Sequence, residues 1–147
     1  MTAKEIIEKL GLVPLEPEGG YFRETFRHSV YIDPSQIRPG YEGKRSLFTV
    51  IYYLLTPETN SAPHRLRSDE MWFFHLGDPA ELTLEYPDGK KVTKILGNRI
   101  DRGETPQVII PAGTVQSAKM AENNYGFSLV STVVVPGFDY RDFELLG

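Results

Sequence analysis

The 147-residue chain contains no cysteine, which excludes several kinds of protein at once. Disulfide-stapled scaffolds, cysteine-ligated zinc sites, cysteine-held iron–sulfur clusters and thiolate nucleophiles all require that side chain. Stability must therefore come from a packed core. A single domain of this length buries roughly 70% of the surface that its unfolded chain exposes. We therefore expect one domain over residues 1–147.

Long apolar runs and blocks of positive charge are also missing. The longest apolar run, residues 47–55, is interrupted by Thr49, whereas a transmembrane helix needs about 18 or more apolar residues. Residues 1–11 lack the charged-then-apolar layout of a signal peptide. The net charge is −4 and no basic block occurs, which argues against a nucleic-acid partner. We expect a cytoplasmic protein that binds neither nucleic acid nor membrane.

Helical periodicity is confined to the N-terminus. Thr2 and Glu5 have the spacing of a capping box, and Gly11 is placed to end the helix. The apolar residues between them fall on one face, which predicts a short helix packed on the outside of a larger body.

The rest of the chain consists of short β-like runs separated by turn residues. Pro87-Asp88-Gly89 between two such runs is a strong hairpin signal. Many short strands, together with 13 glycines and 11 prolines, indicate an antiparallel sandwich or closed barrel. The predicted strands span residues 21–27, 47–55, 70–76, 80–86, 91–96, 108–110, 115–120 and 127–135.

Two segments resemble the paired motifs of the cupin superfamily. Residues 64–70, followed by Gly77, match the spacing of the first motif: His-x-His, three or four residues, Glu, six residues, Gly. Residues 111–116 match the second motif, Pro-x-Gly-x-x-His. The chain departs from the pattern at three positions: Leu66 and Gln116 stand where two histidines belong, and Glu58 replaces the glycine that opens the first motif.

The flanking residues narrow this resemblance. Residues 19–25, 63–65, 69–72 and 135–140 look like those of a single-domain group called cupin family 5, which is similar to jelly rolls of the sugar-nucleotide epimerase type. The resemblance covers residues 12–146. It implies an all-β fold, a double-stranded β-helix or jelly-roll barrel with one short N-terminal helix.

The resemblance also bears on metal binding. A working cupin metal site uses three histidines and one glutamate, of which this chain keeps His64 and Glu70. Leucine has no lone pair to donate, and Gln116 offers only a neutral carbonyl oxygen. We therefore expect no metal cofactor; any metal that does bind would use His64, Glu70 and Gln116. A metal-dependent, oxygenase-like function is disfavoured accordingly.

Without a metal, His64 and Glu70 are still expected to point into the barrel mouth. A histidine–carboxylate pair in an apolar cavity can act as a general acid or base. Epimerases on similar jelly rolls use a histidine base and a tyrosine acid, and Tyr53 is a candidate for the acid. The resemblance thus favours an isomerase or epimerase acting on a sugar-like or nucleotide-linked substrate. Two alternatives are a non-catalytic binding module with the same pocket, and a pair that merely satisfies its own hydrogen bonds.

Strand alternation suggests which other side chains contact a ligand. Trp72 shares the face of Glu70, as core or as a stacking platform, whereas His75 falls on the opposite face. Arg23 and Glu24 are adjacent, so one of them faces inward unless both are exposed edge charges. An inward arginine binds a carboxylate or phosphate.

Three further positions complete the predicted site and its surroundings. Arg65 is a candidate for the rim, and Gln116 for the cavity wall. Residues 29–44 hold Pro34, Pro39 and Gly40 with little apolar periodicity, which is typical of a lid or another functional loop.

Assembly into a homodimer is also expected. Residues 21–44 carry more apolar and aromatic surface than one barrel edge needs, and an exposed edge strand invites pairing with a second copy. Similar jelly rolls generally form two-fold dimers.

Overall fold

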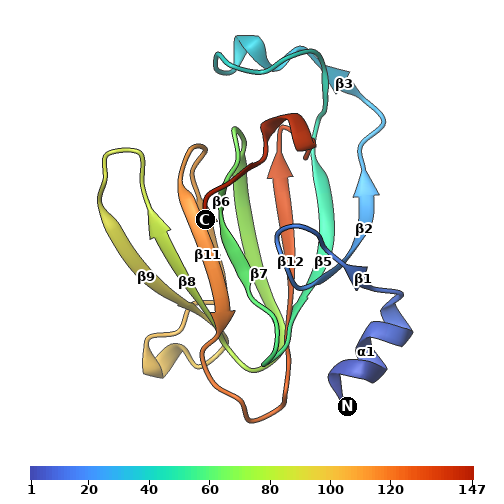
Figure 1. Ribbon diagram of the computed structural model, residues 1–147, viewed down its shortest axis with the longest axis vertical. Helices are drawn as coiled ribbons and strands as arrows, with labels where there is room; N and C mark the ends of the chain where they lie inside the picture. Colours follow the sequence, from blue (N-terminus) through green and yellow to red (C-terminus); the bar gives the residue numbers. More distant parts are fainter.

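The computed structural model describes residues 1–147 and contains two β-sheets that face each other as a jelly-roll barrel (Figure 1). The predicted all-β fold with one N-terminal helix is confirmed. The six-stranded sheet has the order β1-β2-β5-β12-β7-β10, and the five-stranded sheet has the order β13-β6-β11-β8-β9. The strands of the first sheet are β1 (Val13–Pro14), β2 (Tyr21–Arg27), β5 (Thr49–Leu55), β12 (Ser128–Val135), β7 (Asp69–Gly77) and β10 (Gln107–Ile110). Those of the second are β13 (Glu144–Leu145), β6 (Ser61–Arg65), β11 (Val115–Met120), β8 (Ala80–Glu85) and β9 (Lys91–Leu96).

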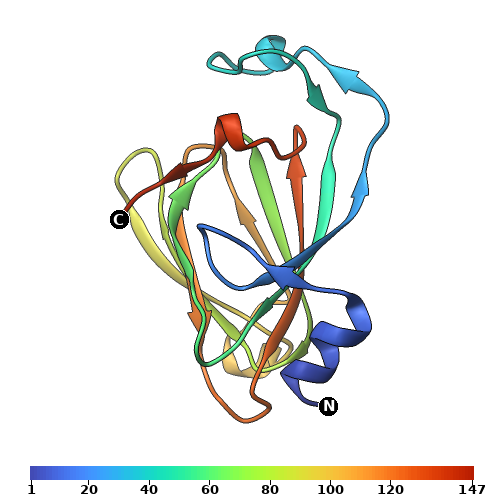
Figure 2. The same cartoon turned by 45° about the vertical axis from the view of Figure 1, so that its right-hand side comes forward.

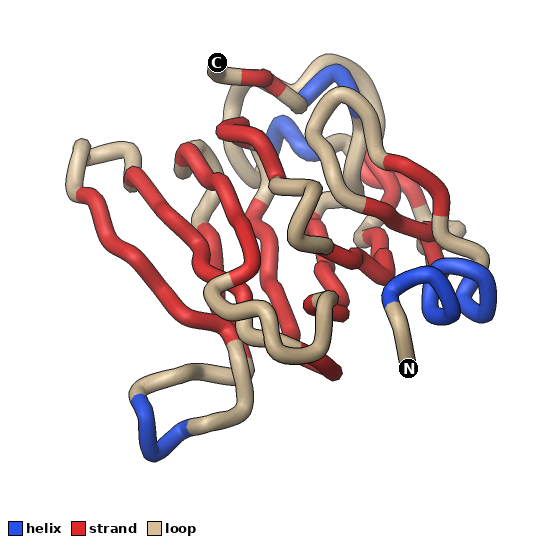
Figure 3. The backbone as a smooth tube through the Cα atoms, turned by 60° about the horizontal axis from the view of Figure 1, so that its bottom comes forward, coloured by secondary structure: helices blue, strands red, loops and turns tan.

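The single α-helix, α1 (Ala3–Leu10), lies on the outside of the barrel (Figure 3). The capping box forms as expected, because the Thr2 side chain accepts from the Glu5 amide and the Glu5 side chain accepts from the Thr2 amide. Gly11 ends the helix with a φ of 66°. Ile6 packs against Leu54 in a small apolar cluster on the outer side of the six-stranded sheet. No helix of the structure is long and apolar enough to span a bilayer.

The main core lies between the two sheets. The side chains of Tyr53 and Trp72 contact each other edge to face, with ring centroids 5.6 Å apart. Aliphatic side chains from both sheets surround them, including Leu82 and Leu84 from β8. Alternation of buried and exposed residues is clear along β8, since its inner leucines flank the exposed Thr83.

The predicted strands correspond to β2, β5, β7, β8, β9, β10, β11 and β12, and their ends shift by at most two residues. The predicted hairpin is confirmed: the Tyr86 amide donates to the Lys90 carbonyl, and Gly89 adopts a φ of 88°. The prediction missed β6, the strand that carries His64, because Pro63 and Arg65 interrupt any apolar run. It also missed the two-residue strands β1, β3 (Tyr31–Ile32), β4 (Arg45–Ser46) and β13, which are too short to show a period.

A β-bulge in β2 changes which residues face the barrel interior. Glu24 pairs with Ile51, but the next residue to pair with β5 is Phe26, so Thr25 is an extra residue in the ladder. An extra residue turns every later side chain of its strand to the other face. Strict alternation from Glu24 would turn Phe26 inward and Arg27 outward; with the bulge, Phe26 turns outward and Arg27 turns inward.

Residues 29–46, which we call the arm, extend beyond the open end of the barrel (Figures 1 and 2). The arm contains β3, the 3₁₀ helix η1 (Pro34–Gln36) and β4. It is fastened at its base, where the Tyr41 hydroxyl donates to the Arg67 carbonyl at 2.7 Å. Arg45 also forms a bidentate ion pair with Asp142 of the C-terminal 3₁₀ helix η3 (Tyr140–Asp142). The segment predicted as a loop is thus a small hairpin with defined anchors.

Candidate functional site

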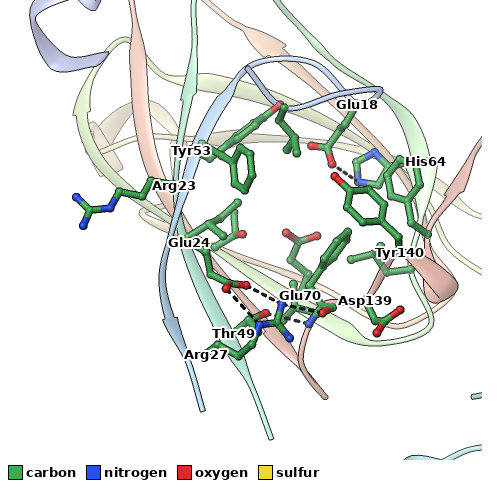
Figure 4. Close-up of a pocket in the computed structure, with 18 of the residues that line it drawn as sticks. Glu18, Arg23, Glu24, Arg27, Thr49, Tyr53, His64, Glu70, Asp139 and Tyr140 are labelled. Carbon is green, nitrogen blue, oxygen red and sulfur yellow. Dashed lines mark hydrogen bonds and ion pairs between the residues drawn. The ribbon is translucent and has the colours of Figure 1, made fainter. Parts of the chain in front are cut away.

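A cavity of about 720 Å³ opens at the end of the barrel beneath the C-terminal segment. That volume is in the range of small-molecule sites. Twelve of its 23 lining residues are hydrophobic, so the polar groups stand in a mainly apolar surrounding. Figure 4 shows Glu18, His64 and Glu70 turned toward the middle of the cavity.

Glu18 comes from the loop between β1 and β2. Gly19 and Gly20 have φ angles of 111° and 78°, and a side chain on either would collide with the Asn60 carbonyl or the Tyr53 ring. These glycines let the loop fold tightly over the barrel. The Ser61 hydroxyl then donates to Glu18 Oε2 at 2.8 Å, which holds the carboxyl group in the cavity wall.

His64 is fixed in one orientation on β6. Its Nδ1 atom lies 2.7 Å from the Ala62 carbonyl oxygen. Because a carbonyl only accepts, Nδ1 carries the hydrogen, and Nε2 of the neutral ring is left as the basic nitrogen. The ring stacks on Phe143 with centroids 5.3 Å apart. Nε2 faces Glu18 Oε1 at 3.6 Å.

Glu70 on β7 is the second buried carboxyl group of the cavity. Gln116 on β11 donates from Nε2 to Glu70 Oε1 at 2.9 Å. Gln116 is itself buried and pairs with His64 in the β6–β11 ladder. It supports Glu70 from behind and does not line the cavity, where the sequence had placed it.

Burial favours the uncharged form of Glu18, Glu70 and His64. It raises the pKa of Glu18 from 4.5 to about 7, against the opposing hydrogen bond from Ser61. Burial, followed by the charge of Glu18, raises the pKa of Glu70 from 4.5 to about 7. Burial also lowers the pKa of His64 below its usual 6.5, which keeps the ring neutral. Near pH 7 the two carboxyl groups can therefore gain or lose a proton at little cost, a property typical of acid–base sites.

The residues present do not fit a cupin metal ion. Leu66 fills the place of one histidine ligand and is buried against the cavity. The amide nitrogen of Gln116 points at Glu70, so Gln116 directs a hydrogen-bond donor, and not a lone pair, toward the place where a metal ion would bind. No group of three or more histidine, cysteine, aspartate or glutamate side chains is arranged to hold a metal.

Two hydrogen-bond donors in the cavity wall have no partner. Neither Trp72 Nε1 nor Thr132 Oγ1 makes a hydrogen bond, although both side chains are 98% buried and line the cavity. Buried polar groups are nearly always satisfied, by protein, water or ligand. The Thr132 hydroxyl lies near Glu70, whose pKa it helps to lower, so Trp72 Nε1 is the donor of this wall that is left wholly without an acceptor.

At the mouth, the structure shows which of the adjacent residues Arg23 and Glu24 directs its charged group inward. Both residues line the cavity, but Glu24 faces inward, whereas the Arg23 guanidinium is directed outward and donates to the Leu10 carbonyl (Figure 4). The inward arginine is Arg27, which the bulge at Thr25 turns into the cavity. Arg27 pairs with Glu24 at 2.7 Å.

The other sequence candidates occupy different places. Tyr53 lines the cavity, but its hydroxyl donates to the Gly19 carbonyl at 2.5 Å, so it anchors the loop that carries Glu18. Burial also raises its pKa well above 10. Arg65 lies outside the cavity and pairs with Glu144. His75 lies on the outer face of the sheet, as alternation predicts, and contacts Ser131.

The C-terminal segment covers part of the mouth. Phe138, Tyr140 and Phe143 form an aromatic cluster there, and all three line the cavity. The Tyr140 hydroxyl donates to the Glu16 carbonyl, which joins the tail to the β1–β2 loop. No pattern of the sequence assigned these residues to the site, because their position depends on the return of the tail to β6.

Comparisons with known proteins agree with this architecture. A family described as "Cupin superfamily (DUF985)" matches residues 4–146. An uncharacterised protein of Saccharomyces cerevisiae is 32% identical over 137 residues, which cover 88% of this chain and 68% of the yeast protein. A hypothetical protein from Leishmania major is 38% identical with a TM-score of 0.89, and the match covers 99% of this chain and 88% of that one.

Two further solved structures extend the comparison. A protein from Shewanella oneidensis is 37% identical with a TM-score of 0.87, over 100% of this chain and 85% of that one. Oxalate decarboxylase from Bacillus subtilis is 16% identical with a TM-score of 0.61, over 92% of this chain and 30% of the enzyme, a likeness of fold alone. The matching family model, the relatives and the two-sheet barrel together show that this chain belongs to the cupin superfamily, in the DUF985 family.

Proposed function

We propose that the protein is a small-molecule enzyme of isomerase or epimerase type that works by acid–base chemistry without a metal. The observation that carries the proposal is the orientation of His64, whose basic Nε2 atom faces the interior of an apolar cavity beside a carboxyl group with a pKa of about 7. The substrate is a sugar-like compound, free or nucleotide-linked, with an acidic C–H bond next to a carbonyl group.

In this proposal His64 Nε2 takes the proton from that carbon. The carbanion is stabilised as an enolate, whose oxygen accepts a hydrogen bond from the free donor Trp72 Nε1. Return of a proton to the opposite face of the carbon, from protonated Glu70, gives the epimer. Tyr53 is not used as the acid, since its hydroxyl hydrogen is engaged by Gly19.

A non-catalytic binding module is the second candidate. It is favoured by the hydrogen bonds from Ser61 to Glu18 and from Gln116 to Glu70, because both carboxyl groups have a partner without any substrate. In that case the same cavity would hold a polar ligand unchanged.

Hydrogen exchange distinguishes the two candidates. Wild-type protein in D₂O should catalyse deuterium incorporation into at least one member of a panel of free, phosphorylated and nucleotide-linked aldoses and ketoses, followed by NMR. His64→Asn should slow this exchange by about 100-fold or more, the usual contribution of a general base. His75→Asn, which changes an exposed histidine on the outer face, is the matched control and should exchange at the wild-type rate.

The remaining outcomes are also informative. Saturable binding without exchange would favour the binding module. Exchange that persists in His64→Asn would remove His64 from the mechanism, and no interaction with any sugar would contradict the proposed ligand class.

We also propose that the protein is a homodimer joined through β2 and the arm. Along β2, only Tyr21 and Phe22 pair with β1, so residues 23–27 present a free edge. Phe26, Val30 and Tyr31 are each about half exposed beside it. A free apolar edge of this kind is stable when a second copy covers it, and the interface should exceed about 1,000 Å² in total.

Light scattering at micromolar concentration should give twice the 16.7 kDa mass of one chain. Phe26→Asp should weaken the dimer at least tenfold, whereas Ile100→Asp, at a more exposed apolar residue in the distant η2 turn (Ile100–Arg102), should not. A monomer in the wild type would contradict the dimer. A dimer that tolerates Phe26→Asp would contradict this interface.

A further inference from the structure

A second cavity of about 620 Å³ lies on the outside of the barrel next to the first. Leu66 and Phe143 line both cavities and form the wall between them. Only three of the eleven residues that line this second cavity are hydrophobic. It contains four arginines and two acidic residues, so it carries net positive charge in a protein whose net charge is −4. We call it the arginine groove; its arginines are Arg38, Arg65, Arg67 and Arg141.

Three separate segments bring these arginines together. Arg65 and Arg67 alternate with the buried His64 and Leu66 at the end of β6. Because side chains alternate in direction along an extended chain, the two arginines point outward. Arg38 comes from the arm, and Arg141 comes from η3. Convergence of three segments distinguishes this cluster from the scattered cations of an ordinary surface.

Two of the arginines are held rigidly by the backbone. Arg38 Nη1 donates to the Arg67 carbonyl at 3.1 Å, and Arg141 Nη1 donates to the Glu42 carbonyl at 2.6 Å. Their remaining hydrogen bonds go to Tyr41, Asp69 and Asp139. Arg38 is paired with Asp69 and Arg141 with Asp139, so carboxylates offset most of their charge and few of their donors remain free.

The other two arginines retain free donors. The Arg67 guanidinium makes no hydrogen bond; its nearest acidic atom is Asp142 Oδ1, at 4.0 Å. That oxygen already accepts from Arg45 Nη2 at 2.9 Å. Arg65 uses only Nε, which donates to Glu144 Oε2 at 2.7 Å. The N–H groups of Arg67 and the terminal nitrogens of Arg65 are therefore available to a ligand.

We propose that the arginine groove binds a phosphoryl group, either free phosphate or diphosphate or the phosphate of an ester. Planar guanidinium groups bind tetrahedral oxyanions through paired N–H donors. Arg67, which makes no hydrogen bond in the protein, provides most of the available charge, and Arg65 and Arg67 provide the hydrogen bonds. The proposal does not depend on the acid–base role of the inner cavity, because it holds equally if that cavity only binds.

Titration with inorganic pyrophosphate at constant ionic strength tests the proposal, with calorimetry as the measurement. Wild-type protein should show saturable binding, and Arg67→Gln and Arg65→Gln should each weaken it at least fivefold. Both residues are about half exposed, so neither substitution should prevent folding. Arg102→Gln, an exposed arginine of η2 outside the groove, is the matched control and should bind as the wild type does. His64→Asn should also bind normally, which separates this site from the proposed function.

Equal binding by Arg67→Gln and the wild type would overturn the proposal, as would a loss of the same size in Arg102→Gln. Absence of saturable binding at pyrophosphate concentrations up to about 10 mM would overturn it as well. If pyrophosphate binds, a comparison of free phosphate with a sugar phosphate shows whether the groove recognises the anion alone or an attached group too.

Discussion

Replacing Asp142 by alanine is expected to lower the free energy of unfolding by about 3–5 kcal/mol, the usual cost of leaving a buried charge without its partner. Arg45 and Asp142 are 1% and 4% exposed, and they are joined by two hydrogen bonds of 2.8 and 2.9 Å. Alanine at position 142 would leave the Arg45 guanidinium buried with only the carbonyls of Glu42 and Lys44 as partners. Urea unfolding followed by tryptophan fluorescence measures the loss.

A double substitution distinguishes charge from packing. Arg45→Met combined with Asp142→Leu removes both charges and restores apolar volume, so it should be less destabilising than Asp142→Ala. If the double variant loses as much stability as the sum of the two single variants, the two residues do not stabilise each other. A loss below about 1 kcal/mol in Asp142→Ala would show that water reaches Arg45 and that the tail is loosely held.

Replacing Glu18 by glutamine is expected to stabilise the protein at pH 8 and to leave its stability at pH 4 nearly unchanged. The pKa of Glu18 is raised from 4.5 to about 7 in the folded state, so the folded protein retains a proton that the unfolded chain releases. The bound proton stabilises the folded state to its full extent below about pH 4.5, and this stabilisation is lost as the pH rises through about 7. Glutamine does not titrate, and its oxygen can still accept from Ser61.

The size of the effect follows from the shift. A pKa change from 4.5 to about 7 corresponds to at most about 3 kcal/mol, so a gain of about 1–3 kcal/mol is expected for Glu18→Gln at pH 8. Glu70 behaves in the same way, and His64 acts in the opposite direction, because its lowered pKa favours the folded state above pH 6.5. Comparing Glu18→Gln with the wild type at each pH isolates the contribution of the Glu18 carboxyl group to stability.

Chemical unfolding at intervals between pH 4 and pH 8.5 provides the measurement. The exposed substitution Glu8→Gln controls for the change in net charge. Parallel stability curves for the wild type and Glu18→Gln would show that Glu18 titrates as it does in water. The acid–base proposal would then lose the perturbed carboxyl group beside His64 Nε2, although not its proton donor Glu70.

Local patterns in the sequence were sufficient for most of the fold. Alternation along residues 80–86, the turn at Pro87-Asp88-Gly89 and the capping box at Thr2 each determine structure over a few residues, so they can be recognised without tertiary information. The resemblance of residues 64–70 and 111–116 to the cupin motifs implied that His64 and Glu70 point inward, and both side chains line the cavity.

The missed residues depend on contacts between distant segments. Glu18 reaches His64 only because Gly19 and Gly20 fit closely against Tyr53 and Asn60, and nothing in the local sequence shows that fit. The signal that was available is the pair of adjacent glycines, which indicates a tight turn directly after an acidic residue. The arginine groove combines three segments of the chain, so no single stretch reveals it.

The extra residue at Thr25 has a consequence for reading related chains. Because it reverses the direction of the two side chains that follow, the count of residues along β2 decides whether a phenyl ring or a guanidinium group faces the cavity mouth. Two proteins with the same phenylalanine and arginine at the end of this strand would offer opposite chemistry to a ligand if one of them lacked the preceding insertion. Ligand preference at this mouth can therefore change by insertion or deletion of one amino acid, without substitution of any residue that touches the ligand.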